Sequence, residues 1–194
     1  DSMIECRLLA DVRRRDGRMV EEDREYFRAT FDIQNRQSEA TDQILCSTKC
    51  ESELDWHRIQ YSSPEGLIYH GPELQELREV ADDGQTIYGR IAASAPVQLF
   101  GGSRTRGFTV PCATMDACLY AVGYAAWIRH QKPSLPVKFG RIEFGRLPDP
   151  GEPCSVRIQQ KELNASGAVW NFVLTGNNGD RLLTVSDYHI GWLK

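Results

Sequence analysis

The sequence lacks an excess of charge of either sign. Its 194 residues include 23 Lys and Arg and 27 Asp and Glu, which gives a formal net charge of -4. A protein that binds nucleic acid or an anionic membrane surface electrostatically carries basic patches, so this balance argues against both classes. Hydrophobic residues make up 41% of the chain and charged residues 26%, which is typical of a globular domain and argues against disorder.

Long hydrophobic runs are also absent. The longest one, 117–128, is shorter than the ~20 residues that a transmembrane helix needs. The first residues do not show the basic segment and apolar segment of a signal peptide. We therefore expect a soluble cytoplasmic protein of one domain, or of one domain and part of another. A chain of this length buries roughly 70% of its unfolded surface, so it needs neither metal nor disulfide to fold.

Closely spaced metal ligands are scarce. Only Cys46 and Cys50 among the six cysteines are near each other in sequence, and the four histidines are scattered. A zinc site would need a second short-spaced pair, and a thiol redox pair would have CxxC rather than CxxxC spacing. The sequence therefore predicts no metal, no redox centre, and reduced, mostly buried cysteines.

The N-terminal residues predict a β-hairpin. Apolar side chains alternate with charged ones around Ile4 to Leu8 and again over 27–33. Asp16-Gly17 is a turn signal, and the acidic run 21–23 is expected to lengthen the loop. Residues 37–60 are polar and irregular, so we interpret them as a linker with one short helix near 51–56.

The remainder predicts one helix among strands. The helix is expected from about Met115 to His130, with Thr114 as its N-cap and Lys132-Pro133 beyond its end. It is apolar on nearly every face, so other elements must enclose it. Strands are expected as a pair within 77–93, about 82–84, and then at 137–147, 154–163, 168–175 and 180–192. Short turns between consecutive strands, including an Asn-Gly pair, indicate an antiparallel sheet. A buried helix wrapped by such a sheet is an α+β hotdog fold.

Asp116 is the leading candidate for chemistry. It is expected in the first turn of the helix, where a carboxylate complements the helix dipole by ~0.3–1 kcal/mol. Alternatively, an apolar wall raises the pKa of this carboxyl, so that it can donate a proton near neutral pH. Tyr69 and His70, before Gly71-Pro72, could be structural turn residues or could line a pocket. The basic glycine loop 101–107 lacks the spacing of a phosphate-binding motif.

Three motifs resemble those of the dehydratase domains of polyketide synthases and polyunsaturated fatty acid synthases, which are double hotdogs. The family has GYxYGPxF early in its second half, and this chain has GLIYHGPEL at 66–74. The family has HPxxLDxxxQ or HPxxLDxxxH on the hotdog helix, and this chain has PCATMDACLY at 111–120. LPFxW matches LPVKF at 135–139 loosely. The resemblance implies that 61–194 form a second hotdog half and that 1–36 are the closing strands of a first.

The resemblance implies removal of water from a 3-hydroxyacyl thioester carried on the phosphopantetheine of an acyl carrier protein. Asp116 would be the acid, and Tyr120 would orient it or contact the substrate hydroxyl. The substrate-binding residues would be Tyr69, His70, Gly71 and Pro72, which would line the acyl tunnel. No other cofactor is expected. Partners would be the carrier protein, neighbouring synthase domains and, through hotdog contacts, a second copy.

Departures from the family pattern leave alternatives open. The family's base is a histidine in HxxxGxxxxP, which none of the four histidines fits, so we expect the base outside this chain and the isolated chain to be inactive. Tyr120 stands where the family has Gln or His, and Pro111-Cys112 stand where it has His-Pro. The chain is then an excised fragment or a degenerate copy. It could also be a non-catalytic structural or docking module, or another hotdog enzyme such as a thioesterase or a product-template cyclase.

Overall fold

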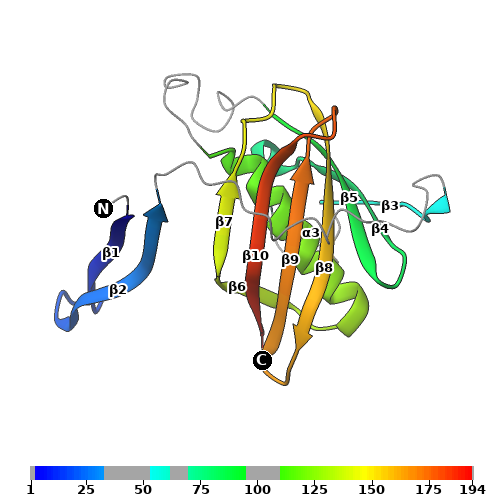
Figure 1. Ribbon diagram of the computed structural model, residues 1–194. Helices are drawn as coiled ribbons and strands as arrows, with labels where there is room; N and C mark the ends of the chain where they lie inside the picture. The colour runs from blue at the N-terminus through cyan, green and yellow to red at the C-terminus, as the bar shows by residue number, and fades with distance from the viewer. Residues whose placement is uncertain (1–2, 33–52, 62–69, 95–109, 194) are drawn as a thin grey trace. The chain divides into compact units, whose positions relative to one another are not determined.

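The computed structural model describes residues 3–32, 53–61, 70–94 and 110–193 (Figure 1). The chain divides into two compact units, Asp1–Glu39 and Ala40–Lys194, which we describe separately. The basic loop 101–107, Tyr69, Cys46 and Cys50 lie outside the described residues.

The first unit contains the predicted antiparallel hairpin. Strand β1 (Met3–Arg13) pairs with β2 (Met19–Asp32), and Gly17 adopts a φ of 85° in the turn between them. The acidic run 21–23 was predicted to lengthen the loop, which is wrong, because these residues lie within β2. Both strands of this ribbon are exposed, so charged side chains stay hydrated there at little cost.

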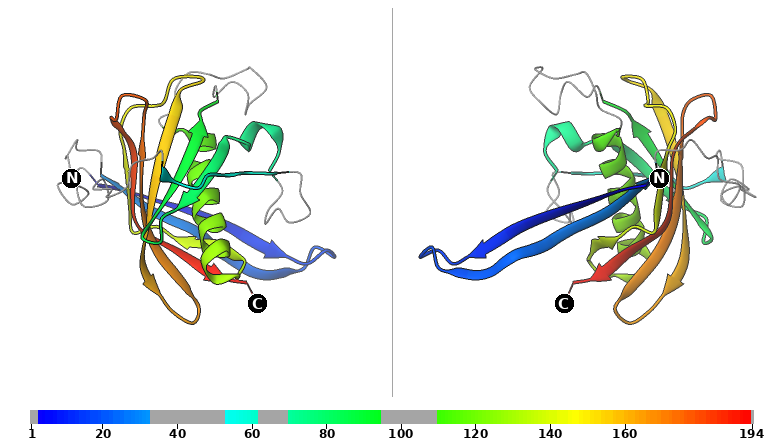
Figure 2. Two further views of the ribbon diagram at one scale, coloured as in Figure 1. Left: turned by 90° about the vertical axis from the view of Figure 1, so that its right-hand side faces the viewer. Right: turned by 60° about the vertical axis from the view of Figure 1, so that its left-hand side comes forward.

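The second unit is an antiparallel sheet with one long helix on it. The strands are β3 (His57–Arg58), β4 (Leu77–Asp82), β5 (Thr86–Ala92), β6 (Ser134–Lys138), β7 (Arg141–Phe144), β8 (Pro153–Leu163), β9 (Gly167–Thr175) and β10 (Arg181–Trp192). Their order is β3-β4-β5-β8-β9-β10-β6, and β7 also pairs with β10. The sheet curves around helix α3 (Cys112–His130), and a 3-10 turn, η2 (Pro72–Leu74), precedes β4 (Figure 2). This arrangement confirms the hotdog fold.

The boundaries differ from the prediction at three places. The expected linker 37–60 contains the short edge strand β3. The expected strand 137–147 is two strands, β6 and β7, which pair with successive parts of β10. Helix α3 begins at Cys112, with Pro111 in the capping position and without a side-chain cap. The Met115 amide donates to the Pro111 carbonyl at 2.8 Å and closes the first turn, so Thr114 is a buried helical residue rather than the cap.

The core lies between the sheet and one side of α3. Small helical residues, among them Ala117, Ala121 and Ala125, are fully buried against sheet residues such as Val156 and Phe172. Small side chains let the helix approach the sheet closely, and Gly89 on β5 allows the same approach from the other side. A Cβ atom at Gly89 would lie 2.7 Å from Val156 and 3.7 Å from Ala121.

The opposite side of α3 is only partly covered by the described residues. Leu119, Gly123, Tyr124 and Trp127 are partly exposed, and Ile128 is exposed. No helix within the described ranges is long and apolar enough to cross a membrane. The described cysteines are free thiols, of which Cys118 and Cys154 are buried, as expected, while Cys6 and Cys112 are exposed.

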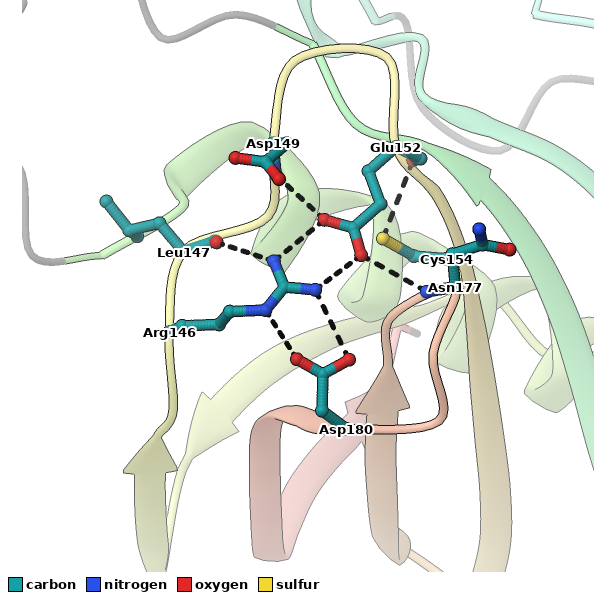
Figure 3. Close-up of polar contacts among 7 residues, drawn as sticks. All are labelled: Arg146, Leu147, Asp149, Glu152, Cys154, Asn177 and Asp180. Atoms are coloured by element: carbon teal, nitrogen blue, oxygen red, sulfur yellow. Dashed lines mark hydrogen bonds and ion pairs between the residues drawn. The ribbon is translucent and has the colours of Figure 1, made fainter.

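A network of one guanidinium and two carboxylates holds one end of the sheet together. The Arg146 guanidinium, just after β7, lies between the carboxylates of Glu152 and Asp180 (Figure 3). Backbone amides of Asp149 and Asn177 donate to the same Glu152 carboxylate at 2.8 and 3.1 Å. The network therefore joins the β7–β8 connection to the β9–β10 turn.

Candidate active site

A cavity of about 150 Å³ opens beside α3. Its walls come from α3, from β10, from the chain around β6, and from the residue that precedes the Gly71-Pro72 turn. The residues that line it are His70, Asp116, Leu119, Tyr120, Gly123, Pro133, Ser134, Leu135, Pro136, Tyr188, Ile190 and Leu193. Most of these side chains are apolar, so the few polar groups face a poorly hydrated space.

Asp116 lies in the second turn of α3 and not in the first. The helix starts at Cys112, and no acidic residue lies in its first turn. The favourable effect of the helix dipole fades beyond the first turn, so it accounts poorly for a carboxylate here. Instead, the Asp116 carboxyl lines the cavity.

His70 is the neighbour of Asp116 across the cavity wall. The His70 Nε2 and Asp116 Oδ2 atoms are 3.0 Å apart, and His70 is only 7% exposed. Apart from His70, no group within the described residues hydrogen-bonds this buried Asp116 oxygen. Burial raises the pKa of Asp116, and the nearby His70 opposes this rise without cancelling it. The site therefore favours a protonated Asp116 more than water does.

Two tyrosines hold the imidazole of His70 in place. The Tyr120 ring meets it edge-on at 4.4 Å between centroids, and Tyr61 stacks on Tyr120 at 5.4 Å. The Tyr61 hydroxyl donates to the Leu77 carbonyl at 3.0 Å, and Gln75 donates to the His70 carbonyl at 2.8 Å. These contacts restrict both ring and backbone, so the position of His70 beside Asp116 is defined before a ligand binds.

The structure thus brings together His70, Asp116 and Tyr120 from the predicted set. Gly71 and Pro72 do not line the cavity; they start η2, which turns the chain directly after His70. Sequence reasoning missed Tyr61, Ser134 and Tyr188. Tyr61 lies at the expected boundary between the linker and the second hotdog half. Tyr188 lies in a predicted strand whose sequence does not show whether the ring points towards the helix or away from it. No group of three or more metal-ligating side chains occurs among the residues that are described.

Comparisons with known proteins bear on the family and the fold of the chain. The family described as "Polyketide synthase dehydratase N-terminal domain" matches residues 29–191. A search of curated proteins found no match. The similar solved structures include several with 13–20% sequence identity to the chain, and a likeness at that level supports the fold and not the activity.

Three of these structures illustrate the likeness. The bifunctional dehydratase-cyclase domain in ambruticin biosynthesis has a TM-score of 0.61 and 14% identity, over 93% of this chain and 60% of that one. The dehydratase domain of RzxB from Pseudomonas fluorescens has a TM-score of 0.59 and 14% identity, over 97% of this chain and 64% of that one. The dehydratase domain of PpsC from Mycobacterium tuberculosis, in complex with C12:1-CoA, has a TM-score of 0.53 and 19% identity, over 71% of this chain and 53% of that one. The chain spans 53–64% of the length of these three structures. With the family match covering most of its length, the chain belongs to the polyketide synthase dehydratase family.

Proposed function

We propose that this chain is the acid-bearing half of a dehydratase domain that removes water from a 3-hydroxyacyl thioester. Asp116 protonates the departing β-hydroxyl, and a base from outside this chain takes the α-proton. The observation that supports this most strongly is a carboxyl in an apolar cavity, with a raised pKa and a buried oxygen whose one hydrogen-bonding neighbour among the described residues is His70. Such a carboxyl is suited to donate a proton near neutral pH.

The distance between His70 and Asp116 supports a positioning role for His70 rather than the role of base. Dehydration needs a base at the α-carbon while an acid reaches the β-oxygen, so the substrate must separate the two groups. The His70 and Asp116 side chains are instead in direct contact at 3.0 Å. His70 then orients the Asp116 carboxyl and stabilises the carboxylate that remains after proton transfer. Tyr120 supports this pair through its contact with the imidazole.

The family and the site both support a substrate that is bound to a carrier. The cavity is apolar and open to solvent on the partly covered side of α3, which suits an acyl group that arrives on a flexible arm. The expected arm is the phosphopantetheine of an acyl carrier protein. Neighbouring synthase domains and a second copy of the domain are the remaining expected partners.

The test is Asp116→Asn in the complete dehydratase that contains this chain. Loss of a general acid should lower kcat about 10²–10⁴-fold, while stability changes by no more than ~1 kcal/mol. Asp55→Asn is the matched control, because that side chain is 93% exposed and should leave kcat unchanged. An Asp116→Asn enzyme with normal kcat would refute the acid role.

The isolated chain tests where the base is. With no base of its own, it should not dehydrate a 3-hydroxyacyl thioester. Turnover by the isolated chain that His70→Gln abolishes would show that His70 is the base and would overturn the positioning role. A panel of 3-hydroxyacyl, saturated acyl and polyketo thioesters should show activity of the complete enzyme on the first only. Hydrolysis of the second or cyclisation of the third would favour a thioesterase or a cyclase.

A further inference from the structure

We propose that Tyr188 is a substrate-orienting residue of this cavity, whose hydroxyl hydrogen-bonds the substrate β-oxygen that Asp116 protonates. This inference rests on the proposed function and deepens it. Tyr188 lies on β10, more than seventy positions from Asp116 in sequence, and both residues line the same cavity. None of the three sequence motifs contains it.

A β-bulge in β10 turns Tyr188 towards the helix. Val185 pairs with Phe172 on β9, and the next pair is Tyr188 with Trp170, so β10 has one extra residue between these pairs. With regular pairing, Asp187 would stand opposite Trp170 and would point into the core, and Tyr188 would point outwards. The bulge exchanges the two, because it shifts the alternation of all following residues by one.

Contacts from three directions hold the bulge. Asp187 has a φ of 54°, which a residue other than glycine adopts only at some cost. Its amide donates to the Asn171 side chain at 2.8 Å, and its carboxylate accepts from Lys161 at 2.5 Å. The Gly140 amide donates to the Asp187 carbonyl at 2.9 Å, in the short gap between β6 and β7. A Cβ atom at Gly140 would lie 2.7 Å from that of Asp187, so this approach requires glycine.

The Tyr188 ring is fixed and its hydroxyl remains available. Phe139 stacks on the ring at 4.9 Å, and Phe172 meets it at 86° and 6.0 Å. Tyr188 is 1% exposed, yet no hydrogen bond to its hydroxyl occurs within the described residues. A buried tyrosine hydroxyl usually has a partner. Burial, followed by the nearby Asp116 carboxylate, raises the pKa of Tyr188, so the phenol stays a neutral donor at working pH.

The cavity also indicates what it receives. A dry cavity of 150 Å³ is known to hold benzene, which has six heavy atoms. The volume here is about the same, and a 3-hydroxybutyryl group likewise has about six heavy atoms. The polar groups lining the cavity are those of His70, Asp116, Tyr120, Ser134 and Tyr188. We infer that the reacting end of a 3-hydroxyacyl group fits here with its β-oxygen between Asp116 and Tyr188.

The experiment measures binding to the 194-residue chain by NMR titration, with 3-hydroxybutyryl and butyryl N-acetylcysteamine thioesters as probes. The wild-type chain should bind the hydroxylated probe about threefold to tenfold more tightly, as expected for one added hydrogen bond to a neutral donor. Tyr188→Phe should reduce this preference severalfold, because only Asp116 then contacts the β-hydroxyl, and should keep its affinity for the butyryl probe. Tyr124→Phe is the control, since Tyr124 packs against the core from the same helix as Asp116 but does not line the cavity.

Each outcome separates the two proposals. A preference that Tyr188→Phe retains in full would overturn the role of Tyr188 and leave the proposed function standing. Absence of binding of both probes to the wild-type chain would count against the proposed function and would overturn this inference with it. Matching thermal unfolding of the wild-type, Tyr188→Phe and Tyr124→Phe chains shows that a reduced preference is not caused by misfolding.

Discussion

Acid should destabilise the second unit through the Glu152 carboxylate, and Arg146→Met should remove most of that pH dependence. Glu152 is held by both guanidinium NH₂ groups of Arg146 at 2.6 and 2.8 Å and by two backbone amides. These hydrogen bonds favour the ionised form, and the pKa of Glu152 falls from 4.5 to about 2. Because the folded-state pKa is lowered, the stabilisation is complete above pH 4.5 and is lost as the pH falls towards 2.

The change in the free energy of unfolding follows from the change in the pKa of Glu152. A difference of about 2.5 pKa units, at 1.36 kcal/mol per unit, corresponds to at most ~3.4 kcal/mol. The Glu152 side chain is only 8% exposed, but those of Arg146 and Asp180 are 39% and 38% exposed, so solvent screens their attraction. We therefore expect about 1–2 kcal/mol of the free energy of unfolding to disappear between pH 5 and pH 2 through this group.

Urea unfolding at several pH values, followed by tryptophan fluorescence, measures this dependence. The difference between wild type and Arg146→Met should be largest at pH 6–7 and should shrink at pH 2–3. Arg141→Met is the matched control. Arg141 and Glu143 form a surface ion pair within β7, the strand that Arg146 follows, and this pair should contribute little to stability. A constant difference between wild type and Arg146→Met across this pH range would refute the electrostatic explanation and indicate lost packing instead.

Three further predictions concern the cavity and the core. In the complete enzyme, His70→Gln should lower kcat and move the alkaline limb of its pH profile upwards, since His70 opposes the rise in the pKa of Asp116; an unmoved limb, with His57→Gln as control, would contradict the coupling. Gly123→Ala should raise the free energy of unfolding by about 0.5–1 kcal/mol, because alanine favours the helix and its methyl group has open space there. The same methyl group would occupy part of the cavity and should weaken binding of acyl thioesters. Thermal unfolding and NMR titration measure the two effects, and tighter binding of acyl thioesters would contradict the second. Gly167→Ala should lower the free energy of unfolding by more than ~2 kcal/mol, because its Cβ would lie 1.9 Å from the Ile190 carbonyl oxygen. A variant that unfolds in urea at the same concentration as wild type would show instead that β9 and β10 can move apart there.

Much of the fold could be predicted because it depends on local patterns. Alternation identified β1 and β2 with the Asp-Gly turn between them, turn signals such as the Asn-Gly pair separated β8, β9 and β10, and the apolar run identified α3. The start of α3 was misplaced because its capping position holds Pro111, which has no capping side chain, whereas Thr114 matches the usual signal. The division of 137–147 into β6 and β7 was missed because it depends on the bulge at Asp187 in a distant strand.

The site shows the same limit. Asp116 was identified from its own surroundings in the sequence, an acid next to an apolar helix. Its contact with His70, by contrast, depends on a turn forty-six positions earlier that the fold brings back to α3. Tyr188 depends on a single extra residue in β10, which alternation within that strand does not reveal. Pattern therefore identified the candidate acid, and tertiary pairing determined its neighbours.

Two departures from the family motifs acquire a common meaning in the structure. Counted from Gly71-Pro72, His70 stands where GYxYGPxF has its second Tyr, and Tyr120 stands where the helix motif has Gln or His. Taken alone, the change at Tyr120 left both an excised fragment and a degenerate copy open. In the fold the two rings touch, at 4.4 Å between centroids, and His70 reaches Asp116. Compared with the family motifs, this chain has a histidine at the turn and a tyrosine on the helix, so the candidate acid has one ring of each kind close by. That compensation favours a working acid over a decayed one.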